Sequence, residues 1–310
     1  MKKRIVILDH EGGGRLANQL WNFTSLYAYS LEKNYVLENY SFFRYTKFFN
    51  IATPKNSLIR FFFFDFLYKQ HWYRMLGPYE KFTTLMQTIN KSKILVDDRV
   101  NPFYLPPSKP INQKQEELIQ WIDNNSSETV YTSGWLFRNP IGLQKYRKEI
   151  IEYFKPKNSI LVKIDSLLSP LRLRYKHIIG VHIRQTDYKK WHNGKYFFEQ
   201  SEIKQILNEY LIDSNKKIDE TVFVICSDGE INQPIFSGLN IVLPEGNEAE
   251  DLFTLSKTDI IIGSNSTYGA WASYYGDIPF VVFERNGIDW EYYRDKQRYF
   301  ENKKNTLTHY

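Results

Sequence analysis

The sequence predicts an α/β protein made of two units, each with a parallel β-sheet. Short, continuously apolar runs recur along the 310 residues, and helical patterns lie between them. Such runs are typical of strands buried on both faces, and their alternation with helices is typical of parallel sheets. A polar, proline-containing segment, 155–159, interrupts the pattern near the middle of the chain. We therefore predict one domain over 1–155 and another over 156–310.

The individual elements follow from the same patterns. A helix is predicted after the first strand because four apolar or aromatic residues share one face: Leu16, Leu20, Phe23 and Tyr27. Further helices are predicted over 144–154 and 202–211. The predicted strands are 4–8, 35–38, 94–96, 129–132, 178–184, 222–226, 240–243, 260–262 and 280–283.

The net charge of +6 favours anionic partners. The basic residues are scattered, which argues against a dedicated nucleic-acid face, so nucleic acid is not an expected partner. The single cysteine, Cys226, cannot form an intramolecular disulfide, which fits a reducing compartment such as the cytoplasm. We expect no signal peptide and no membrane span. The apolar, aromatic segment 58–69 favours a core helix, with peripheral membrane contact as the alternative.

Three predicted strands end in residues suited to an anion. The first is followed by the glycine-rich segment 11–19 and a helix start. The fifth ends in His182-Ile183-Arg184-Gln185-Thr186-Asp187-Tyr188, and the eighth is followed by Gly263-Ser264-Asn265-Ser266-Thr267. Arginine donates paired hydrogen bonds to phosphate, and helix N-termini offer free N–H groups. The structural alternatives are a surface ion pair between Arg184 and Asp187 and simple helix capping by the serine and threonine.

These segments resemble a known family. Gly13-Gly14-Arg15-Leu16-Ala17-Asn18-Gln19-Leu20 is similar to the "GRxGNQ" motif of fucosyltransferases, and the run that begins at His182 is similar to their "HxRRxDY" motif. Residues 251–267 resemble their late donor-binding segment. The match favours the bacterial α-1,2-fucosyltransferases of glycosyltransferase family 11, within the wider GDP-fucose superfamily.

The resemblance implies a GT-B fold, in which two Rossmann-like domains face each other across a cleft. The first would hold the acceptor and the second the donor. It further implies transfer of fucose from GDP-fucose with inversion, without a metal or other cofactor, to a glycan hydroxyl. The expected acceptor is a galactose-containing oligosaccharide or polysaccharide, linked α-1,2. No Asp-x-Asp pair at a strand end offers a cation site for a diphosphate.

The resemblance also implies roles for individual residues. Arg184, Ser266 and Thr267 would bind the diphosphate, His182 and Asp251 would read guanine, and Asp228 would lie near the nucleoside. A plain turn residue is the alternative for Asp228. The complete predicted donor set is Gly14, Arg15, Asn18, His182, Arg184, Asp228, Asp251, Ser264, Asn265, Ser266 and Thr267.

The predicted catalytic residues are Arg184, Asp187, Asn18 and Glu11. Asp187 is the nearby candidate for the general base, although it could instead orient Arg184; Glu11, beside the glycine turn, is the other candidate. The sequence departs from the family at Gln185, where a second arginine is usual. This change predicts weaker diphosphate binding or a different donor. The alanine at position 17, in place of a glycine, is a change that a helix start tolerates.

Two alternatives to a fucosyltransferase remain open at this point. One is a related glycosyltransferase with another nucleotide sugar, and the other is a non-catalytic protein that binds nucleotides or glycans. For acceptor recognition we predict the aromatic stretch 40–79, with Trp135 and Arg138, while most of these aromatics are expected in the core.

Overall fold

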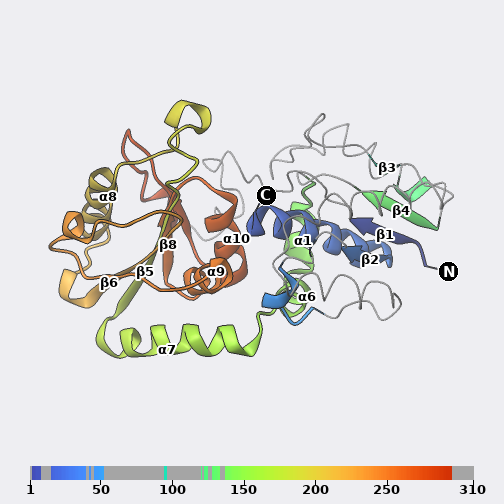
Figure 1. Cartoon of the computed structure of the whole chain (residues 1–310), viewed down its shortest axis with the longest axis horizontal. Coiled ribbons are helices and arrows are strands. Elements are labelled where there is room, and N and C mark those ends of the chain that lie inside the picture. The colour runs from blue at the N-terminus through green and yellow to red at the C-terminus, as the bar shows by residue number, and fades with distance from the viewer. Residues whose placement is uncertain are drawn as a thin grey trace. The chain divides into compact units, whose positions relative to one another are not determined.

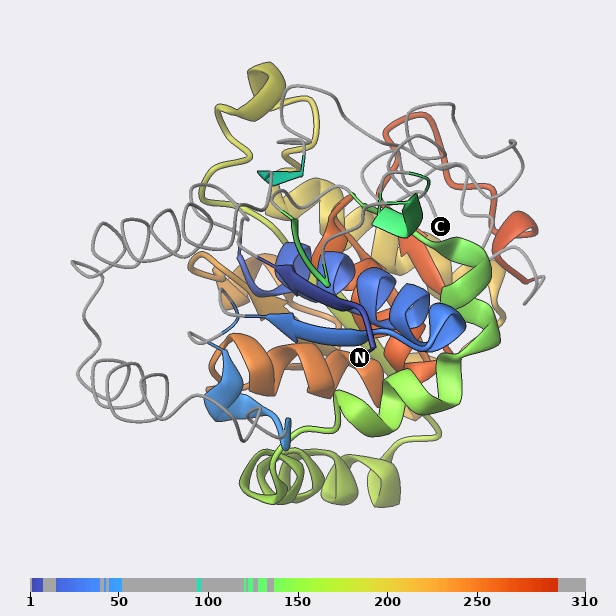
Figure 2. The ribbon, with the colours of Figure 1, turned by 90° about the vertical axis from the view of Figure 1, so that its right-hand side faces the viewer.

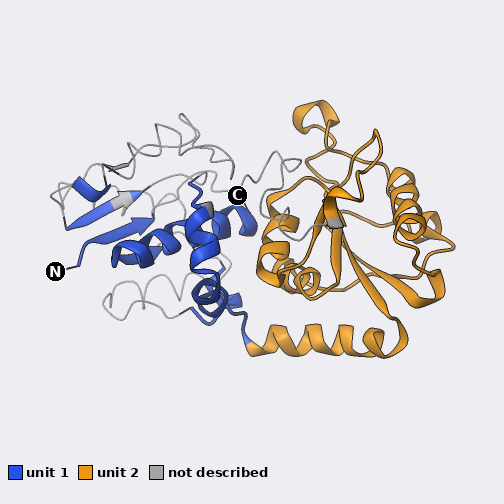
Figure 3. Ribbon diagram, turned by 180° about the vertical axis from the view of Figure 1, so that it is seen from behind, with its two compact units in different colours: residues 1–157, 310 blue, residues 158–309 orange. Residues whose placement is uncertain are grey.

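The computed structural model describes residues 2–7, 15–39, 42, 45–51, 94–95, 120, 122–124, 128–132 and 137–294. The chain divides into two compact units between Lys157 and Asn158, close to the division predicted after residue 155 (Figure 3). Each unit is an α/β structure with its own sheet. Among the helices of the described residues, none has the length and hydropathy needed to cross a membrane.

The first unit contains a parallel sheet in the order β2-β1-β4-β3. Strands β1 and β2 lie side by side in Figure 2 and are joined by the long helix α1. The elements are β1 (Arg4–Ile7), α1 (Leu16–Lys33), β2 (Val36–Asn39), the 3-10 helix η2 (Thr46–Phe48), β3 (Ile94–Leu95), β4 (Thr129–Thr132), α5 (Pro140–Lys145) and α6 (Arg147–Tyr153).

Helix α1 buries the apolar face predicted from the sequence. Leu16, Leu20 and Phe23 are buried on it, whereas Tyr27 is only partly buried. Phe23 packs edge-to-face on Phe154 at 4.9 Å between ring centroids. The helix ends where Asn34 takes the left-handed conformation, with a φ of 57°. The helix predicted over 144–154 is present as α6, but it begins only at Arg147. A separate helix, α5, precedes it and was not predicted; α5 begins at Pro140, where Asn139 accepts a hydrogen bond from the Gly142 N–H, and it ends before Tyr146, whose φ of −106° and ψ of 22° depart from helical values.

The second unit has a five-stranded parallel sheet in the order β7-β6-β5-β8-β9 (Figure 1). Its helices and strands are α7 (Asn158–Arg174), β5 (His177–Ile183), α8 (Gln200–Asp213), β6 (Thr221–Ser227), β7 (Ile241–Val242), α9 (Glu248–Ser256), β8 (Ile260–Gly263), α10 (Thr267–Gly276) and β9 (Phe280–Val282). Its 3-10 helices are η4 (Trp191–Gly194), η5 (Ile218–Glu220), η6 (Gln233–Phe236) and η7 (Tyr292–Arg294).

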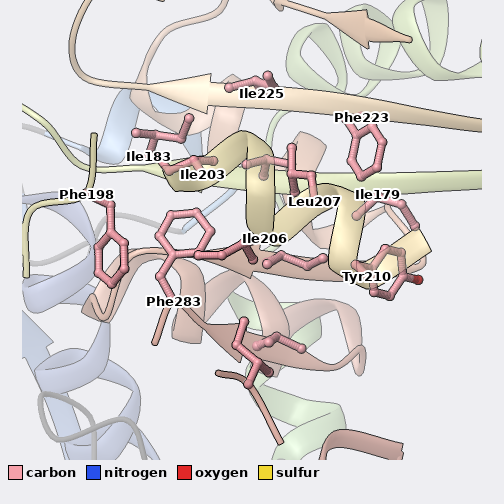
Figure 4. Close-up of a cluster of buried hydrophobic side chains, with 14 of the residues drawn as sticks. Ile179, Ile183, Phe198, Ile203, Ile206, Leu207, Tyr210, Phe223, Ile225 and Phe283 are labelled. Carbon is pink, nitrogen blue, oxygen red and sulfur yellow. The ribbon is translucent and has the colours of Figure 1, made fainter. Parts of the chain in front are cut away.

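The two faces of this sheet pack against different helices. Ile179 and Ile183 of β5 point to the face covered by α8, where they join a cluster of buried side chains (Figure 4). The alternate residue Gly180 faces α9, and a Cβ there would lie 2.7 Å from Thr258 Oγ1 and 3.0 Å from Leu255 Cδ2. Side chains along β5 therefore alternate between the α8 face and the α9 face.

The strand order indicates where this sheet would bind a ligand. Counted along the chain, the strands run outward in both directions from β5, so the order reverses between β5 and β8. In open α/β sheets, ligands bind beyond the carboxyl ends of the strands at such a switch point. The residues that follow Ile183 and Gly263 lie at this edge of the sheet.

Candidate functional site

The two motifs of the second unit meet at the switch point. His182 of β5 pairs in register with Gly263 of β8, and the Ser264 N–H donates to the His182 carbonyl at 2.8 Å. Past the strand ends, the Arg184 N–H donates to Ser264 Oγ at 2.9 Å. The buried Tyr188 hydroxyl donates to the Asn265 carbonyl at 2.8 Å. The side chain of Ser264 and the backbone of Asn265 therefore hold the two segments together.

Arg184 is held by two carboxylates. Its Nε donates to Asp187 Oδ1 at 2.7 Å and its Nη2 donates to Asp187 Oδ2 at 2.8 Å, so the pair is bidentate. Asp228 Oδ2 lies 3.2 Å from the same Nε. Nη1 makes no hydrogen bond with any described residue, and a guanidinium has five N–H donors. The Nη1 edge is therefore available to a ligand.

Asp228 is held mainly by the segment after β5. It accepts hydrogen bonds from the Gln185 N–H at 2.7 Å, from the Thr186 N–H at 3.3 Å and from Thr186 Oγ1 at 2.7 Å. Burial raises the pKa of Asp228, but these hydrogen bonds and the charge of Arg184 outweigh it and bring the pKa below its ordinary value. Asp228 is thus a permanent anion beside Arg184.

His182 is buried with both ring nitrogens outside hydrogen-bond geometry. Burial and the charge of Arg184 lower the pKa of His182 to about 3, against smaller opposing contributions from Asp228 and the Cys226 backbone. The imidazole is therefore neutral at physiological pH. It stacks on the ring of Tyr268, with 4.8 Å between centroids and 29° between the planes.

Asp251, on the first half of α9, has a buried Oδ1 without a hydrogen-bond partner. Burial, followed by the charges of Glu250 and Glu248, raises the pKa of Asp251 to about 7. Asp251 lies near the ring of Tyr268, whose pKa its charge raises and whose hydroxyl donates to the Glu248 carbonyl at 2.6 Å. The side chains of His182 and Asp251, both with unsatisfied polar atoms, thus lie by one aromatic ring. Unsatisfied buried polar atoms are costly, which indicates a ligand with complementary groups.

Helix α10 begins at the same edge of the sheet. Ser266 is its N-cap, and its side chain accepts a hydrogen bond from the Gly269 N–H at 3.3 Å. Thr267 is the first helical residue. The capping interpretation of Ser266 is therefore correct, and it is compatible with anion binding, because the N-terminus of a helix carries a partial positive charge.

Gln185 takes other partners than Arg184. Its Nε2 donates to Ser227 Oγ and to the Glu230 carbonyl, both at 3.0 Å. The side chain of Gln185 is directed to the turn after β6 and to the start of α8. It therefore does not take part in the group of charged side chains around Arg184.

The predicted residues of the first unit are described in part. Arg15 is the exposed N-cap of α1, and Asn18 is half-buried in the first turn of this helix. Ala17 is buried within the helix, which fits the expected tolerance of this position. Glu11 and Gly14 lie outside the described residues.

The predicted acceptor residues are mostly buried where the structure describes them. Phe42, Tyr45, Phe48 and Phe49, from the stretch 40–79, are core residues and cannot stack on a sugar. Arg138 is buried as well, and its Nη1 donates to the neighbouring Phe137 carbonyl at 2.9 Å. The burial of these aromatics agrees with the expectation that most of the stretch is core, and the burial of Arg138 does not support it as an acceptor contact. Trp135 and the remainder of 40–79 lie outside the described residues.

Two aromatic residues of the site were not predicted. Tyr268 contacts His182, and Tyr188 contacts both Arg184, at 5.5 Å from Cζ to the ring centroid, and Asn265. Tyr188 is the last residue of the motif that begins at His182, and Tyr268 directly follows Thr267, so their position in the sequence was the available signal. Within the described ranges, no group of three His, Cys, Asp or Glu side chains could hold a metal ion.

A scan of the sequence against protein-family models finds no match, and a search of curated proteins finds no relative. Comparison with solved structures finds fucosyltransferases. NodZ from Bradyrhizobium is 15% identical with a TM-score of 0.53, over 93% of this chain and 97% of that chain. A complex of POFUT1 with GDP-fucose is 12% identical with a TM-score of 0.52, over 91% and 98%.

A variant of FUT1 from Arabidopsis thaliana in complex with GDP is 14% identical with a TM-score of 0.51, over 92% of this chain and 72% of that chain. The chain has the GT-B fold. The fold class predicted from the sequence is thereby confirmed. The polar residues at the switch point all belong to the second unit.

Proposed function

We propose that this protein is a glycosyltransferase that transfers fucose from GDP-fucose to a glycan hydroxyl. The observation that carries the proposal is the set of unused polar groups at the switch point of the second unit. His182 and Asp251 have unsatisfied polar atoms beside Tyr268, and Arg184 has an unused Nη1 edge. The similar structures of NodZ and POFUT1 were solved with GDP-fucose, which supports this donor.

The chemistry of the residues fits a guanosine diphosphate. An ionised Asp251 can accept from the N1–H and N2 amino groups of guanine, and the neutral His182 ring can donate or accept one further hydrogen bond. Arg184 and the N-terminus of α10 supply positive charge for the diphosphate. Both stabilise the charge that builds up on the leaving group as the glycosidic bond breaks. For this reason we propose that transfer needs no metal ion or other cofactor.

The general base must contact the acceptor hydroxyl. Both oxygens of Asp187 accept from the guanidinium of Arg184. We therefore assign Asp187 to orienting Arg184 and retain Glu11, with Asn18 nearby in the sequence, as the candidate acceptor-side residues. Inversion at the anomeric carbon is the expected outcome of direct displacement by an acceptor activated in this way.

The finer assignments rest on the sequence motifs. They favour family 11 of the glycosyltransferases, an α-1,2 linkage and a galactose-containing oligosaccharide or polysaccharide acceptor. A cytoplasmic location, with possible peripheral contact to a membrane, is part of the same proposal. Acceptor selection is assigned to the first unit, residues 1–157, but outside the buried aromatics named above.

The test is donor hydrolysis with a panel of nucleotide sugars, in the presence of a chelator. Cleavage of GDP-fucose in preference to GDP-mannose and UDP-galactose is the expected result. Preferential cleavage of another donor would support a different glycosyltransferase. Tight GDP binding without cleavage of any donor would support a binding protein, and strict dependence on added metal would contradict the role given to Arg184.

A further inference from the structure

We propose that Gln185 is a positioning residue: its side chain fixes the turn after β6, so that Asp228 in this turn holds Arg184 against the diphosphate. The inference rests on the proposed function and deepens it. It concerns the one motif position at which the chain departs from the arginine of the resembled family, and it assigns the glutamine a task of its own.

The alternation of side chains along β5 explains why the side chains of Arg184 and Gln185 point in opposite directions. His182 lies on the α9 face and Ile183 lies in the core under α8. Continued past the strand end, the same alternation sends Arg184 to the side of His182 and Gln185 to the side of α8. Gln185 is only 9% exposed there, although it follows the end of the strand.

Two glutamine side chains form a clamp on the turn. Gln185 Nε2 donates to Ser227 Oγ and to the Glu230 carbonyl, both at 3.0 Å. Gln200, the first residue of α8, donates from Nε2 to the same carbonyl at 2.8 Å and to Gln185 Oε1 at 3.3 Å. The Oε1 of Gln200 accepts from the Asn232 N–H at 2.9 Å. We call Gln185 and Gln200 the glutamine clamp.

Backbone partners fix the orientation of both amides. A backbone carbonyl can only accept and a backbone N–H can only donate, so the bonds to Glu230 and Asn232 determine which end of each amide is nitrogen. The turn also packs closely on Gln185: a Cβ on Gly229, within the turn, would lie 3.0 Å from Gln185 Cβ. The turn from 227 to 232 is therefore held by two side chains, Gln185 from the segment after β5 and Gln200 from the start of α8.

Asp228 is the residue through which the clamp acts. It sits between Ser227 and Gly229, and its Oδ2 lies 3.2 Å from Arg184 Nε. The Gln185 N–H binds Asp228 directly, while the Gln185 side chain fixes the turn on which Asp228 stands. Loss of the amide therefore leaves the charge of Arg184 in place but loosens one of the two carboxylates that set its orientation.

Arginine could not replace glutamine in this arrangement. It has no acceptor atom, so it could not accept the hydrogen bond from Gln200 Nε2. A second guanidinium would also place a buried positive charge beside the turn that holds Asp228. The clamp is therefore an amide-specific solution, and restoring the arginine is expected to weaken it.

The experiment compares the binding of guanosine and of GDP by calorimetry. Gln185→Met keeps the length of the side chain and removes its three side-chain hydrogen bonds. We expect the affinity for GDP to fall about ten-fold while the affinity for guanosine, which lacks phosphate, stays the same. Gln200→Met should act in the same way, and the double variant should be no weaker than either single variant, because both remove one clamp.

Gln205→Met is the matched control, because Gln205 is exposed on the same helix. It should bind both ligands like the wild type. If Gln185→Met does not fold, Gln200→Met tests the same clamp, since Gln200 makes no direct contact with Asp228.

Three results would overturn the inference. Equal losses for guanosine and GDP would mean a merely structural role, and an unchanged affinity for GDP would mean no role in orienting Arg184. Either result leaves the proposed function intact if the wild type binds GDP. A wild type that binds neither ligand would overturn the proposed function and this inference together.

Discussion

The carboxylate of Asp187 faces the guanidinium of Arg184 through two parallel hydrogen bonds, Nε–Oδ1 at 2.7 Å and Nη2–Oδ2 at 2.8 Å. An ion pair between these residues is also the plainest interpretation of the sequence. The pair fixes one edge of the guanidinium and leaves Nη1 without a hydrogen bond to any described residue. With Asp228 at 3.2 Å, the orientation of Arg184 is determined before the ligand arrives.

Replacing Arg184 by lysine tests the need for this planar geometry. Arg184→Lys keeps the positive charge but loses the planar guanidinium. A lysine cannot make two parallel hydrogen bonds to Asp187 and at the same time present a separate N–H edge to the ligand. We expect turnover of GDP-fucose to fall about a hundred-fold or more. Arg172→Lys is the control, because Arg172 forms an exposed ion pair with Asp259 at 2.5 Å and should tolerate the change. Near-normal turnover by a folded Arg184→Lys protein would remove Arg184 from the mechanism.

The variant Asp187→Asn separates an orienting residue from a general base. Loss of a base would lower turnover without changing GDP affinity, whereas loss of an orienting group lowers both. We expect GDP affinity to fall several-fold, on the order of 1 kcal/mol for a charged hydrogen bond in a part-exposed pair. Asp165→Asn, which removes an exposed ion pair with Lys257, is the control. Unchanged GDP affinity together with abolished turnover would restore Asp187 as the base.

Much of the fold is predictable from the sequence, because a strand is present within every predicted range, and the central strands β5, β6 and β8 are apolar runs buried along almost their whole length. Helix α7 was missed for a physical reason. It buries only Ile160, Ile164 and Leu168, a stripe too narrow to stand out, and Pro170 inside it resembles a helix end. The polar residues before Asn158, which mark the boundary, lead directly into this helix.

The site is predictable in part. Arg184, Asp187 and His182 stand out as a polar run at the end of an apolar strand. The partnership of Asp228 with Arg184 is not visible in the sequence, because it depends on the pairing of β5 with β6. The direction of Gln185 could have been inferred from the alternation of β5, but its partners on α8 and the turn required the tertiary structure.

The pH dependence of guanosine binding follows from Asp251. Its pKa is raised to about 7 by burial and by Glu250 and Glu248, whereas the pKa of His182, about 3, keeps this ring neutral throughout. Because only the ionised carboxylate accepts both guanine donors, affinity should rise up to about ten-fold per pH unit below 7 and level off above it. Guanosine is the ligand to use, since the phosphates of GDP titrate near pH 6.

The stability of the free protein should depend on pH in the opposite direction to its affinity for guanosine. The folded pKa of Asp251 lies above its ordinary value of 3.8, so the free protein loses stability as pH rises from about 4 to about 7. Asp251→Asn removes both effects and should bind guanosine weakly at every pH. Guanosine affinity that stays constant between pH 5 and 8 in the wild type would contradict the assignment of Asp251 to guanine.

Gly263 joins the fold to the site, and its replacement by alanine tests that connection. A Cβ at this position would lie 2.6 Å from the His182 carbonyl oxygen and 2.9 Å from His182 Cβ, so β8 must shift against β5. We expect the free energy of unfolding to fall by about 1–3 kcal/mol, as for other overpacked positions, in urea titrations. Because the shift displaces His182 and Ser264, GDP affinity should fall as well.

Gly238→Ala is the control: its φ of 87° strains alanine, but nothing lies within 4 Å of the added Cβ. It should cost about 1 kcal/mol or more in stability and leave GDP affinity unchanged. A Gly263→Ala protein with wild-type stability would show that the two strand ends are not in contact as described.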